Sequence, residues 1–226
     1  MMKRAIKSIF QRLYPYGVFC SDKRAVYLTF DDGPIPEVTP KVLAILEKYN
    51  IKATFFMVGE NIDKHPEVFE QVLKAGHHIG NHTYNHLKGW RTSFREYMAN
   101  VAKWEETYKR ALTGTKSAGL TAKRSNSEAV CQRQRSLFRP PYGKATLRQR
   151  IALHKLGYTL IYWDILTKDY DASVTPEQML RLIQRDTRPG SIINFHDSVK
   201  SNERMLTVLP QAIEWLQKEG YVLAAL

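Results

Sequence analysis

The chain has 226 residues, of which 43% are hydrophobic and 11% aromatic, which suits one sizeable packed domain and excludes a wholly disordered chain. Lys and Arg number 34 against 22 Asp and Glu, so the formal charge is +12 at pH 7. No nucleic-acid-binding motif accompanies this charge, which argues against a nucleic-acid partner.

Residues 1–22 are predicted to form a short, partly amphipathic lead-in to a domain that spans residues 23–226. The lead-in carries basic residues at positions 3, 4 and 7 and no apolar run of signal-peptide length. No stretch of the chain reaches the length of a transmembrane helix. We therefore expect a cytoplasmic or membrane-peripheral protein, with an atypical export route as the alternative. Cys20 and Cys131 are too few for a disulfide framework and are expected to be free thiols.

The first predicted strand, residues 26–30, contains only β-branched, aromatic and aliphatic side chains, as in an inner strand of a parallel sheet. It ends in Asp31 and Asp32, after which Gly33 and Pro34 turn the chain. Because adjacent carboxylates repel each other, the pair suggests a nearby cation or a role in proton transfer. An ordinary Asp-Gly turn is the alternative.

Helices and strands alternate about seven times along the rest of the chain. This alternation favours an α/β barrel, although an open doubly wound sheet fits it nearly as well. Further strands are expected over residues 52–58, 78–80, 137–138, 158–163, 191–195 and 221–223. Helices are expected over residues 37–49, 65–76, 93–112, 146–156, 176–188 and 203–219.

More than half of the net positive charge lies in one segment of the chain. Eight basic residues and the single acid Glu128 fall between Lys109 and Arg139. Residues 113–136 are rich in Ser, Thr, Gly, Lys and Arg and lack periodicity, so we expect a long surface insertion there. A solvated basic loop is the simpler interpretation, and a weak contact with an anionic surface is the alternative.

The placement of the reactive side chains favours the barrel. These side chains follow directly on different predicted strands, and in a barrel the carboxyl ends of the strands converge on one face, where such folds carry their chemistry. The residues concerned are Asp31, Asp32, His82, His86, Arg139, Asp164 and His196.

Two of these strand ends predict a metal site. His82 and His86 are four positions apart, and on a helical turn both imidazoles would lie on one face and bind one cation. One carboxylate from Asp31 or Asp32 completes a set of two His and one acid, which leaves positions open for water and substrate. We expect Zn²⁺ first, with Co²⁺ or Ni²⁺ as alternatives.

The same residues suit hydrolysis, which needs a base for the attacking water and an acid for the leaving group. The acid of the pair that does not bind metal is the candidate base, and His196 is the candidate acid. Arg139 is expected to keep the base ionised, and Asp169 is expected to orient His196 and raise its pKa. Taken singly, Arg139 also fits a surface cation, and His196 with Asp197 fits a turn at a strand end.

Four motifs follow one another along the chain: Thr29-Phe-Asp-Asp-Gly-Pro34, His82-Thr-Tyr-Asn-His86, Arg139-Pro-Pro-Tyr142 and a strand that ends in His196-Asp197. In this order they resemble the motifs of the NodB-like polysaccharide deacetylases, carbohydrate esterase family four. The resemblance covers about residues 25–222. It implies a single-domain, TIM-like, distorted (β/α)7 barrel that removes acetyl groups from N- or O-acetylated sugars with one divalent metal.

The resemblance also implies a role for each matching residue. Asp31 resembles the general base of the family. The three residues that resemble its metal ligands are Asp32, His82 and His86. The remaining roles belong to groups around the base and the acid. Arg139 resembles the residue that steadies the base, Tyr142 the backbone oxyanion donor, Asp169 the tuning carboxylate and His196 the acid.

Two positions depart from the family pattern. Tyr170 follows the tuning Asp169 where relatives usually have Trp, and Asn194 lies two positions before His196 where they usually have Leu. That Leu lines the pocket for the acetyl methyl group, so a polar Asn194 is expected to weaken the pocket and leaves the acyl group open. The expected substrate-binding residues are Tyr142, Tyr170 and Asn194.

The leading expectation is a metal-dependent hydrolase that removes acetyl groups from N-acetylated sugars, with an acetylated glycan as its partner. Hydrolysis of O-acetyl esters or small amides at the same site is a rival, kept open by Asn194. A carbohydrate-binding barrel without turnover is a third alternative, and the complete set of site residues argues against it. The insertion at 113–136 precedes Arg139 and is expected to reach the rim of the groove.

Overall fold

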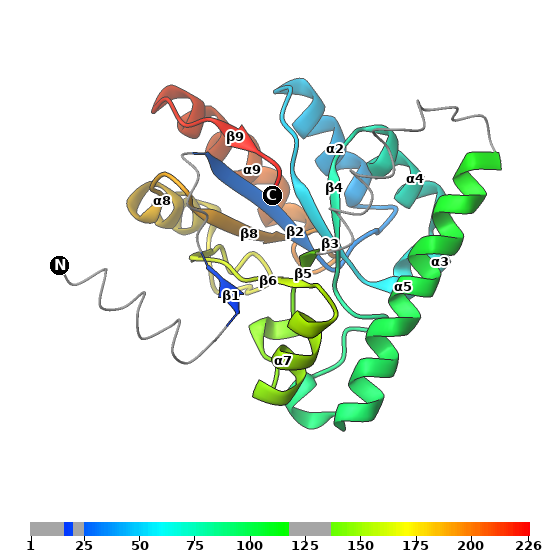
Figure 1. Ribbon diagram of the computed structural model, residues 1–226. Helices are drawn as coiled ribbons and strands as arrows, with labels where there is room; N and C mark the ends of the chain where they lie inside the picture. Colours follow the sequence, from blue (N-terminus) through cyan, green and yellow to red (C-terminus); the bar gives the residue numbers. More distant parts are fainter. Residues whose placement is uncertain (1–15, 20–24, 118–136) are drawn as a thin grey trace.

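One parallel sheet organises the structure, a computed structural model that describes residues 16–19, 25–117 and 137–226 (Figure 1). Its strands are β1 (Gly17–Val18), β2 (Val26–Asp31), β3 (Thr54–Met57), β4 (His78–Asn81), β5 (Leu137–Phe138), β6 (Thr159–Ile161), β7 (Ile165–Leu166), β8 (Ile192–His196) and β9 (Leu223–Ala224).

The order of the strands is that of a barrel. It runs β1-β6-β5-β4-β3-β2-β8-β7, with β9 also paired to β2, and each pairing is parallel. From β2 the chain adds β3 to β6 on one side and β7 and β8 on the other, which is the cyclic order of a barrel rather than of an open doubly wound sheet. The predicted distorted (β/α)7 barrel is therefore confirmed, as a curled sheet in one domain.

Helices cover the outside of the curled sheet, as Figure 1 shows. They are α2 (Thr39–Lys48), α3 (Gly59–Lys64), α4 (Pro66–Lys74), α5 (Phe94–Ser117), α7 (Leu147–Lys155), α8 (Pro176–Asp186) and α9 (Asn202–Lys218). Two short 3-10 helices, η1 (Gly89–Arg91) and η2 (Pro141–Gly143), lie in the loops that follow β4 and β5. Among the described helices, none combines the length and the apolarity needed to cross a membrane.

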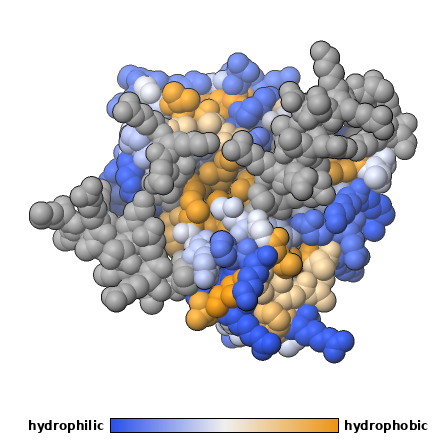
Figure 2. All heavy atoms as spheres, in the orientation of Figure 1, coloured by the Kyte–Doolittle hydropathy of each residue, from blue (hydrophilic) through white to orange (hydrophobic). Residues whose placement is uncertain are grey.

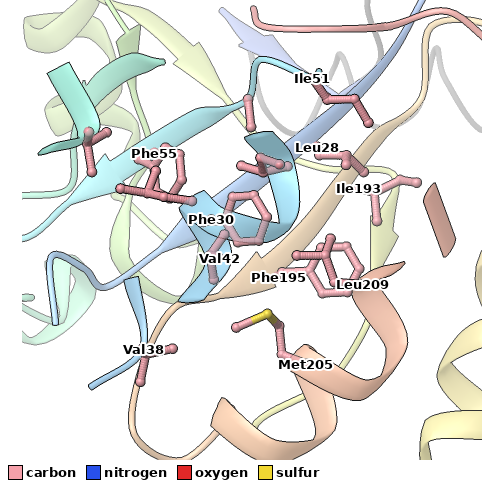
Figure 3. Close-up of a cluster of buried hydrophobic side chains, with 14 of the residues drawn as sticks. Leu28, Phe30, Val38, Val42, Ile51, Phe55, Ile193, Phe195, Met205 and Leu209 are labelled. Atoms are coloured by element: carbon pink, nitrogen blue, oxygen red, sulfur yellow. The ribbon is translucent and has the colours of Figure 1, made fainter. Parts of the chain in front are cut away.

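The main hydrophobic core lies between the sheet and the helices. Phe30 of β2 stacks on Phe55 of β3 and Phe195 of β8, with ring centroids 5.0 and 5.8 Å apart, and all three are fully buried (Figure 3). Side chains alternate between the two faces of a strand. Because Phe30 faces the helices, its neighbours Thr29 and Asp31 face the barrel interior, where the candidate site lies.

Most predicted elements agree with the structure to within a few residues, and the exceptions are short elements. The sequence did not predict α3, β1 or β7. Residues 17–18, part of the predicted lead-in, pair with β6 and belong to the sheet. Helix α5 continues to Ser117, into the segment expected to be a loop. The rest of that insertion, most of the lead-in, Cys20 and Cys131 lie outside the described residues.

The surface carries both hydrophilic and apolar residues. On the face shown in Figure 2, apolar residues gather toward the middle and hydrophilic residues surround them. The exposed aromatic side chains of the described residues include Trp90 at 41% and Tyr142 at 49%. Both belong to the 3-10 helices that follow β4 and β5, on the side of the barrel where the candidate site lies.

Candidate active site

The two acids at the end of β2 have different surroundings. Asp31, the last residue of the strand, points into the barrel and is 2% exposed. Asp32 has a left-handed backbone with φ of 87°, and its side chain is 28% exposed. This change of backbone conformation directs the adjacent carboxylates to different places, so one can stay buried while the other meets the two histidines.

Asp32, His82 and His86 form a group that could hold a metal ion, with one ligand atom from each within 4.8 Å of the others. Asp32 Oδ1 lies 3.3 Å from His86 Nε2 and 3.8 Å from His82 Nε2. Two imidazole nitrogens and one carboxylate oxygen suit Zn²⁺, Co²⁺ or Ni²⁺. The predicted ligands therefore lie together, and their chemistry fits the expected cation.

His82 is fixed in the form that a cation needs. Its Nδ1 lies 2.7 Å from the carbonyl oxygen of Arg139, so Nδ1 donates and the lone pair of Nε2 faces Asp32 and His86. Burial is the main cause that lowers the pKa of His82 to about 4. The ring is therefore neutral at physiological pH, which leaves its lone pair free for a cation.

The backbone that brings His82 and His86 together differs from the predicted helical turn. The loop that carries the pair is not helical, and Thr83 and His86 have left-handed φ values of 64° and 57°. Asn81 Oδ1 accepts the backbone N–H of Thr83 at 2.7 Å, and Asn100 Oδ1 accepts that of Tyr84 at 2.8 Å. The prediction of a helical turn is wrong, because side-chain amides hold this loop in place of intrahelical hydrogen bonds.

Asp31 belongs to a buried polar network. Arg139 Nη1 donates to Asp31 Oδ1 at 2.7 Å, and Asn194 Nδ2 donates to Asp31 Oδ2 at 3.0 Å. The Oδ1 atom of Asn194 in turn accepts from Arg139 and from the hydroxyl of Thr29. Burial alone would raise the pKa of Asp31, but the charge of Arg139, followed by those of nearby histidines, outweighs it and lowers the pKa. Asp31 is therefore an ionised carboxylate in a nearly water-free place.

Arg139 is itself held on several sides. Its Nε donates to the carbonyl of Ile161 at 3.3 Å and its Nη2 to that of Tyr162 at 3.0 Å. The guanidinium lies 4.1 Å from the ring centroid of Phe56 and 5.5 Å from that of Trp163. These contacts are of the kind that a planar guanidinium makes best. Arg139 is therefore a buried residue held by backbone carbonyls and two aromatic rings rather than a surface cation.

His196 and Asp169 form the second ionisable pair. The ring Nδ1 of His196 donates to Asp169 Oδ1 at 2.8 Å, and the backbone N–H donates to Asp169 Oδ2 at 2.7 Å. Burial would lower the pKa of His196, but the hydrogen bond and charge of Asp169, with the charges of Asp31 and Asp32, raise it to about 9. The ring therefore carries a proton at neutral pH.

The three expected substrate-binding residues have different exposures. Tyr142 has a left-handed φ of 59°, and its half-exposed ring lies 4.6 Å from the ring of His86. Tyr170 is 43% exposed, and its ring is edge-on to His196 at 5.0 Å. Asn194 is fully buried beside Asp31. Its expected contact with an acyl group stays a prediction.

Asp164 lies apart from the other predicted site residues. Its carboxylate accepts from the hydroxyl of Ser191 at 2.9 Å and the backbone N–H of Ile192 at 2.7 Å, and it pairs with Arg188 at 3.0 Å. These partners lie at the start of β8, at the opposite end of that strand from His196. The expectation that Asp164 joins the site is wrong, because the chain after β6 enters the sheet again beside the start of β8.

Asp197 is a buried residue of the site that sequence reasoning treated only as part of a turn. Its Oδ1 accepts the backbone N–H of Gly33 at 3.0 Å, and its Oδ2 accepts the hydroxyl of Thr39 at 2.6 Å. A Cβ on Gly33 would lie 2.0 Å from Asp197 Oδ2, so the turn after Asp32 needs glycine. Burial raises the pKa of Asp197 to about 8. The carboxyl group ties the Asp-Asp turn to the end of β8.

One structural neighbour shows why the side chains matter more than the fold. A crystal structure of a carbohydrate esterase family four pseudoenzyme from Bacillus anthracis has a TM-score of 0.75 at 22% identity, covering 93% of this chain and 67% of that one. A likeness at this identity shows the barrel alone. Whether such a barrel is active therefore depends on the residues at its strand ends.

Other comparisons identify the family. The family model for polysaccharide deacetylase matches residues 20–161. A peptidoglycan-N-acetylglucosamine deacetylase of Bacillus cereus is 33% identical over 177 residues, 78% of this chain and 57% of the relative. A chitooligosaccharide deacetylase of Azorhizobium caulinodans is 29% identical over 217 residues, 91% of this chain and 94% of the relative.

The fold of this chain also agrees with a solved deacetylase structure. The crystal structure of the Bc1960 peptidoglycan N-acetylglucosamine deacetylase, in complex with 4-naphthalen-1-yl-N-oxidanyl-benzamide, has a TM-score of 0.80 at 29% identity. The match covers 96% of this chain and 93% of that one. The chain belongs to the polysaccharide deacetylase family.

Proposed function

We propose that this chain hydrolyses N-acetyl groups of an acetylated glycan, with one divalent cation held by Asp32, His82 and His86. One observation carries the proposal: two ionisable groups with opposite pKa shifts lie at paired positions of neighbouring strands. Asp31 of β2 pairs in register with His196 of β8. The first has a lowered pKa and the second a raised one, so a base and an acid coexist at neutral pH.

In this proposal the two residues move protons in opposite directions. Asp31 takes a proton from water as the water oxygen bonds to the acetyl carbonyl carbon. His196 gives a proton to the amide nitrogen as the carbon–nitrogen bond breaks, so that acetate and an amine leave. Arg139 and Asn194 hold Asp31 in its ionised form, and Asp169 holds the ring of His196. The backbone N–H of Tyr142 is the proposed donor to the carbonyl oxygen.

The candidate cation site, next to Asp31 in the chain, is suited to the same hydrolysis. A divalent cation, when bound, polarises the acetyl carbonyl and lowers the pKa of water. Asp32 and His86 are each 28% exposed, so the ligand group is open to solvent on their side. The ring of His82 is buried and neutral, which leaves its lone pair available to the cation. Zn²⁺ is the first candidate because two imidazoles and a carboxylate are its common ligands in catalytic sites.

The test is acetate release from a panel of glycans, with Zn²⁺, Co²⁺ and Ni²⁺ supplied in turn. We expect release from N-acetylglucosamine oligomers or peptidoglycan fragments, and none after chelation. Release from acetylated xylan alone would favour the O-acetyl esterase alternative. Glycan binding without release of acetate by any metal-loaded preparation would favour the binding barrel and contradict the proposal.

Replacing His82 by Ala is expected to remove both the bound cation and the activity. The substitution deletes one of three ligand atoms and leaves the site with a single imidazole. Titration with Co²⁺, followed by its visible absorption, measures the affinity without any assay of turnover. His154→Ala is a suitable control because that imidazole stacks on Tyr16 and is no part of the ligand group. Unchanged Co²⁺ affinity in His82→Ala would refute the assignment of the site.

Replacing Asp169 by Asn is expected to move the alkaline limb of the pH–activity profile to lower pH. His196 acts in its protonated form, so activity falls as the pH rises through its pKa of about 9. Asparagine cannot supply the negative charge that raises this pKa, so the limb moves toward the ordinary histidine value of 6.5. The pH profile of kcat/KM for both proteins measures the shift. A limb that stays in place would assign the acid to another group.

A further inference from the structure

A cluster of exposed aromatic and basic side chains borders the candidate cation site, formed by Lys88, Trp90, Tyr142 and Lys144 and here called the basic rim. The rings of Trp90 and Tyr142 make an edge-to-face contact, with centroids 5.5 Å apart and an interplanar angle of 85°. Tyr142 in turn lies 4.6 Å from the ring of His86. The basic rim is therefore continuous with the candidate ligand group.

Both lysines of the basic rim lie over its aromatic rings. Lys88 Nζ is 5.5 Å from the ring centroid of Tyr142, and Lys144 Nζ is 5.3 Å from that of Trp90. The two segments that carry these side chains, residues 82–95 and 137–163, contain no Asp or Glu. Positive charge on this side of the site is therefore not offset by acids of the same segments.

The backbone below the basic rim is fixed. Gln149 Nε2 donates to the carbonyl of Gly89 at 2.8 Å, and Gln149 Oε1 accepts the backbone N–H of Thr146 at 2.8 Å. A Cβ on Gly89 would lie 2.9 Å from Gln149 Oε1 and 3.1 Å from the carbonyl of Lys144. Helix α7 and η1 are thus tied together by one buried side chain. The side chains of the basic rim are attached to a backbone that is already fixed, which lowers the entropic cost of ordering them around a ligand.

We propose that the basic rim binds a sugar unit that carries a carboxylate, next to the N-acetyl sugar held at the cation site; this rests on the proposed function. Trp90 and Tyr142 are 41% and 49% exposed, and the exposed parts of their rings offer apolar surface to a sugar. The ammonium groups of Lys88 and Lys144 offer the opposite charge to a carboxylate on that ring. The preferred substrate is therefore an acidic N-acetylated glycan rather than a neutral one.

The test compares two glycans that differ only in charge. One is the tetrasaccharide of alternating N-acetylglucosamine and N-acetylmuramic acid with free carboxylates, and the other is the same compound with its carboxylates amidated. We expect kcat/KM for acetate release at low ionic strength to be about five- to twentyfold higher for the free acid, since two exposed charge contacts contribute modestly. Added salt should reduce the ratio.

Variants assign the preference to the basic rim. Lys88→Gln combined with Lys144→Gln should bring the ratio of the two kcat/KM values close to one, through the KM for the free acid. Lys48→Gln is the matched control, because Lys48 lies 5.1 Å over the ring of Tyr49 at the end of α2. Trp90→Ala should lower kcat/KM for both glycans by a similar factor.

The outcomes separate this inference from the proposed function. Equal kcat/KM for the two glycans, or a preference that survives the double lysine variant, would overturn the inference while release of acetate upholds the function. Calorimetric titration of the metal-loaded protein with each glycan makes the same comparison without turnover. Equal affinity for the two glycans would overturn the inference even in a preparation that releases no acetate.

Discussion

Replacing Asp31 by Asn is expected to lower kcat by about a hundredfold or more, because a general base contributes roughly 10²–10⁴ to such reactions. The amide keeps the size of the side chain between Arg139 and Asn194 but cannot take a proton from water. Asp31 supplies no atom to the ligand group, so the bound cation should stay. Acetate release at saturating glycan measures kcat, and elemental analysis of the same preparations measures the metal content.

Asp186→Asn provides the matched control for this experiment. Asp186 pairs with Arg185 at the end of α8, with 40% of its side chain exposed, and it is not one of the site residues named above. The same chemical change there should alter neither activity nor metal content. Full activity in Asp31→Asn would mean that another group is the base. Loss of metal together with activity would make Asp31 a ligand and would reverse the roles proposed for the two acids.

The general position of the site was predictable because it depends on buried strands and their ends. Runs of apolar residues mark β2 and β8, and parallel strands put their carboxyl ends on one side of the sheet. Asp31 and His196 each end such a run, and in the structure they are paired in register. Their position on one side of the sheet therefore followed from the sequence pattern, whereas their pairing in register came from the structure.

The local geometry was not predictable, because it depends on contacts between segments far apart in the chain. The loop of His82 and His86 is held by amides from Asn81 and Asn100, which no i, i+4 spacing indicates. The amide of Asn194 meets Asp31 and Arg139, a pair of contacts that the sequence analysis did not include beside the expected substrate contact. Its position two residues before His196 on one strand was the available signal, since such residues share a face.

Replacing Arg139 by Met is expected to destabilise the fold by about 3–5 kcal/mol, because it leaves a buried carboxylate without its cation. Asp31 is 2% exposed and Arg139 is fully buried, and Nη1 lies 2.7 Å from Oδ1. Methionine keeps an apolar stem against Phe56 and removes the charge. A domain is stable by roughly 5–15 kcal/mol in total, so the loss is large. Urea unfolding of the metal-free proteins measures it.

The pH dependence of this loss should identify the unpaired carboxylate as its cause. In the unsubstituted chain the folded-state pKa of Asp31 is below 3.8, so its ion pair stabilises the fold above that pH and the contribution is lost as the pH falls through the lowered pKa. Without Arg139, burial raises the pKa of Asp31, and protonation removes the buried charge. The deficit of Arg139→Met should therefore shrink between about pH 7 and about pH 4.

The double variant Arg139→Met with Asp31→Asn separates the effect of charge from that of packing, because it contains neither charge. It should recover part of the stability lost in the single Arg139 variant and lose most of the pH dependence of the deficit. Recovery is expected to be partial, since the carbonyls of Ile161 and Tyr162 still lack their donor. An equal deficit at both pH values, unchanged in the double variant, would mean that lost packing against Phe56 rather than an unpaired charge destabilises the barrel.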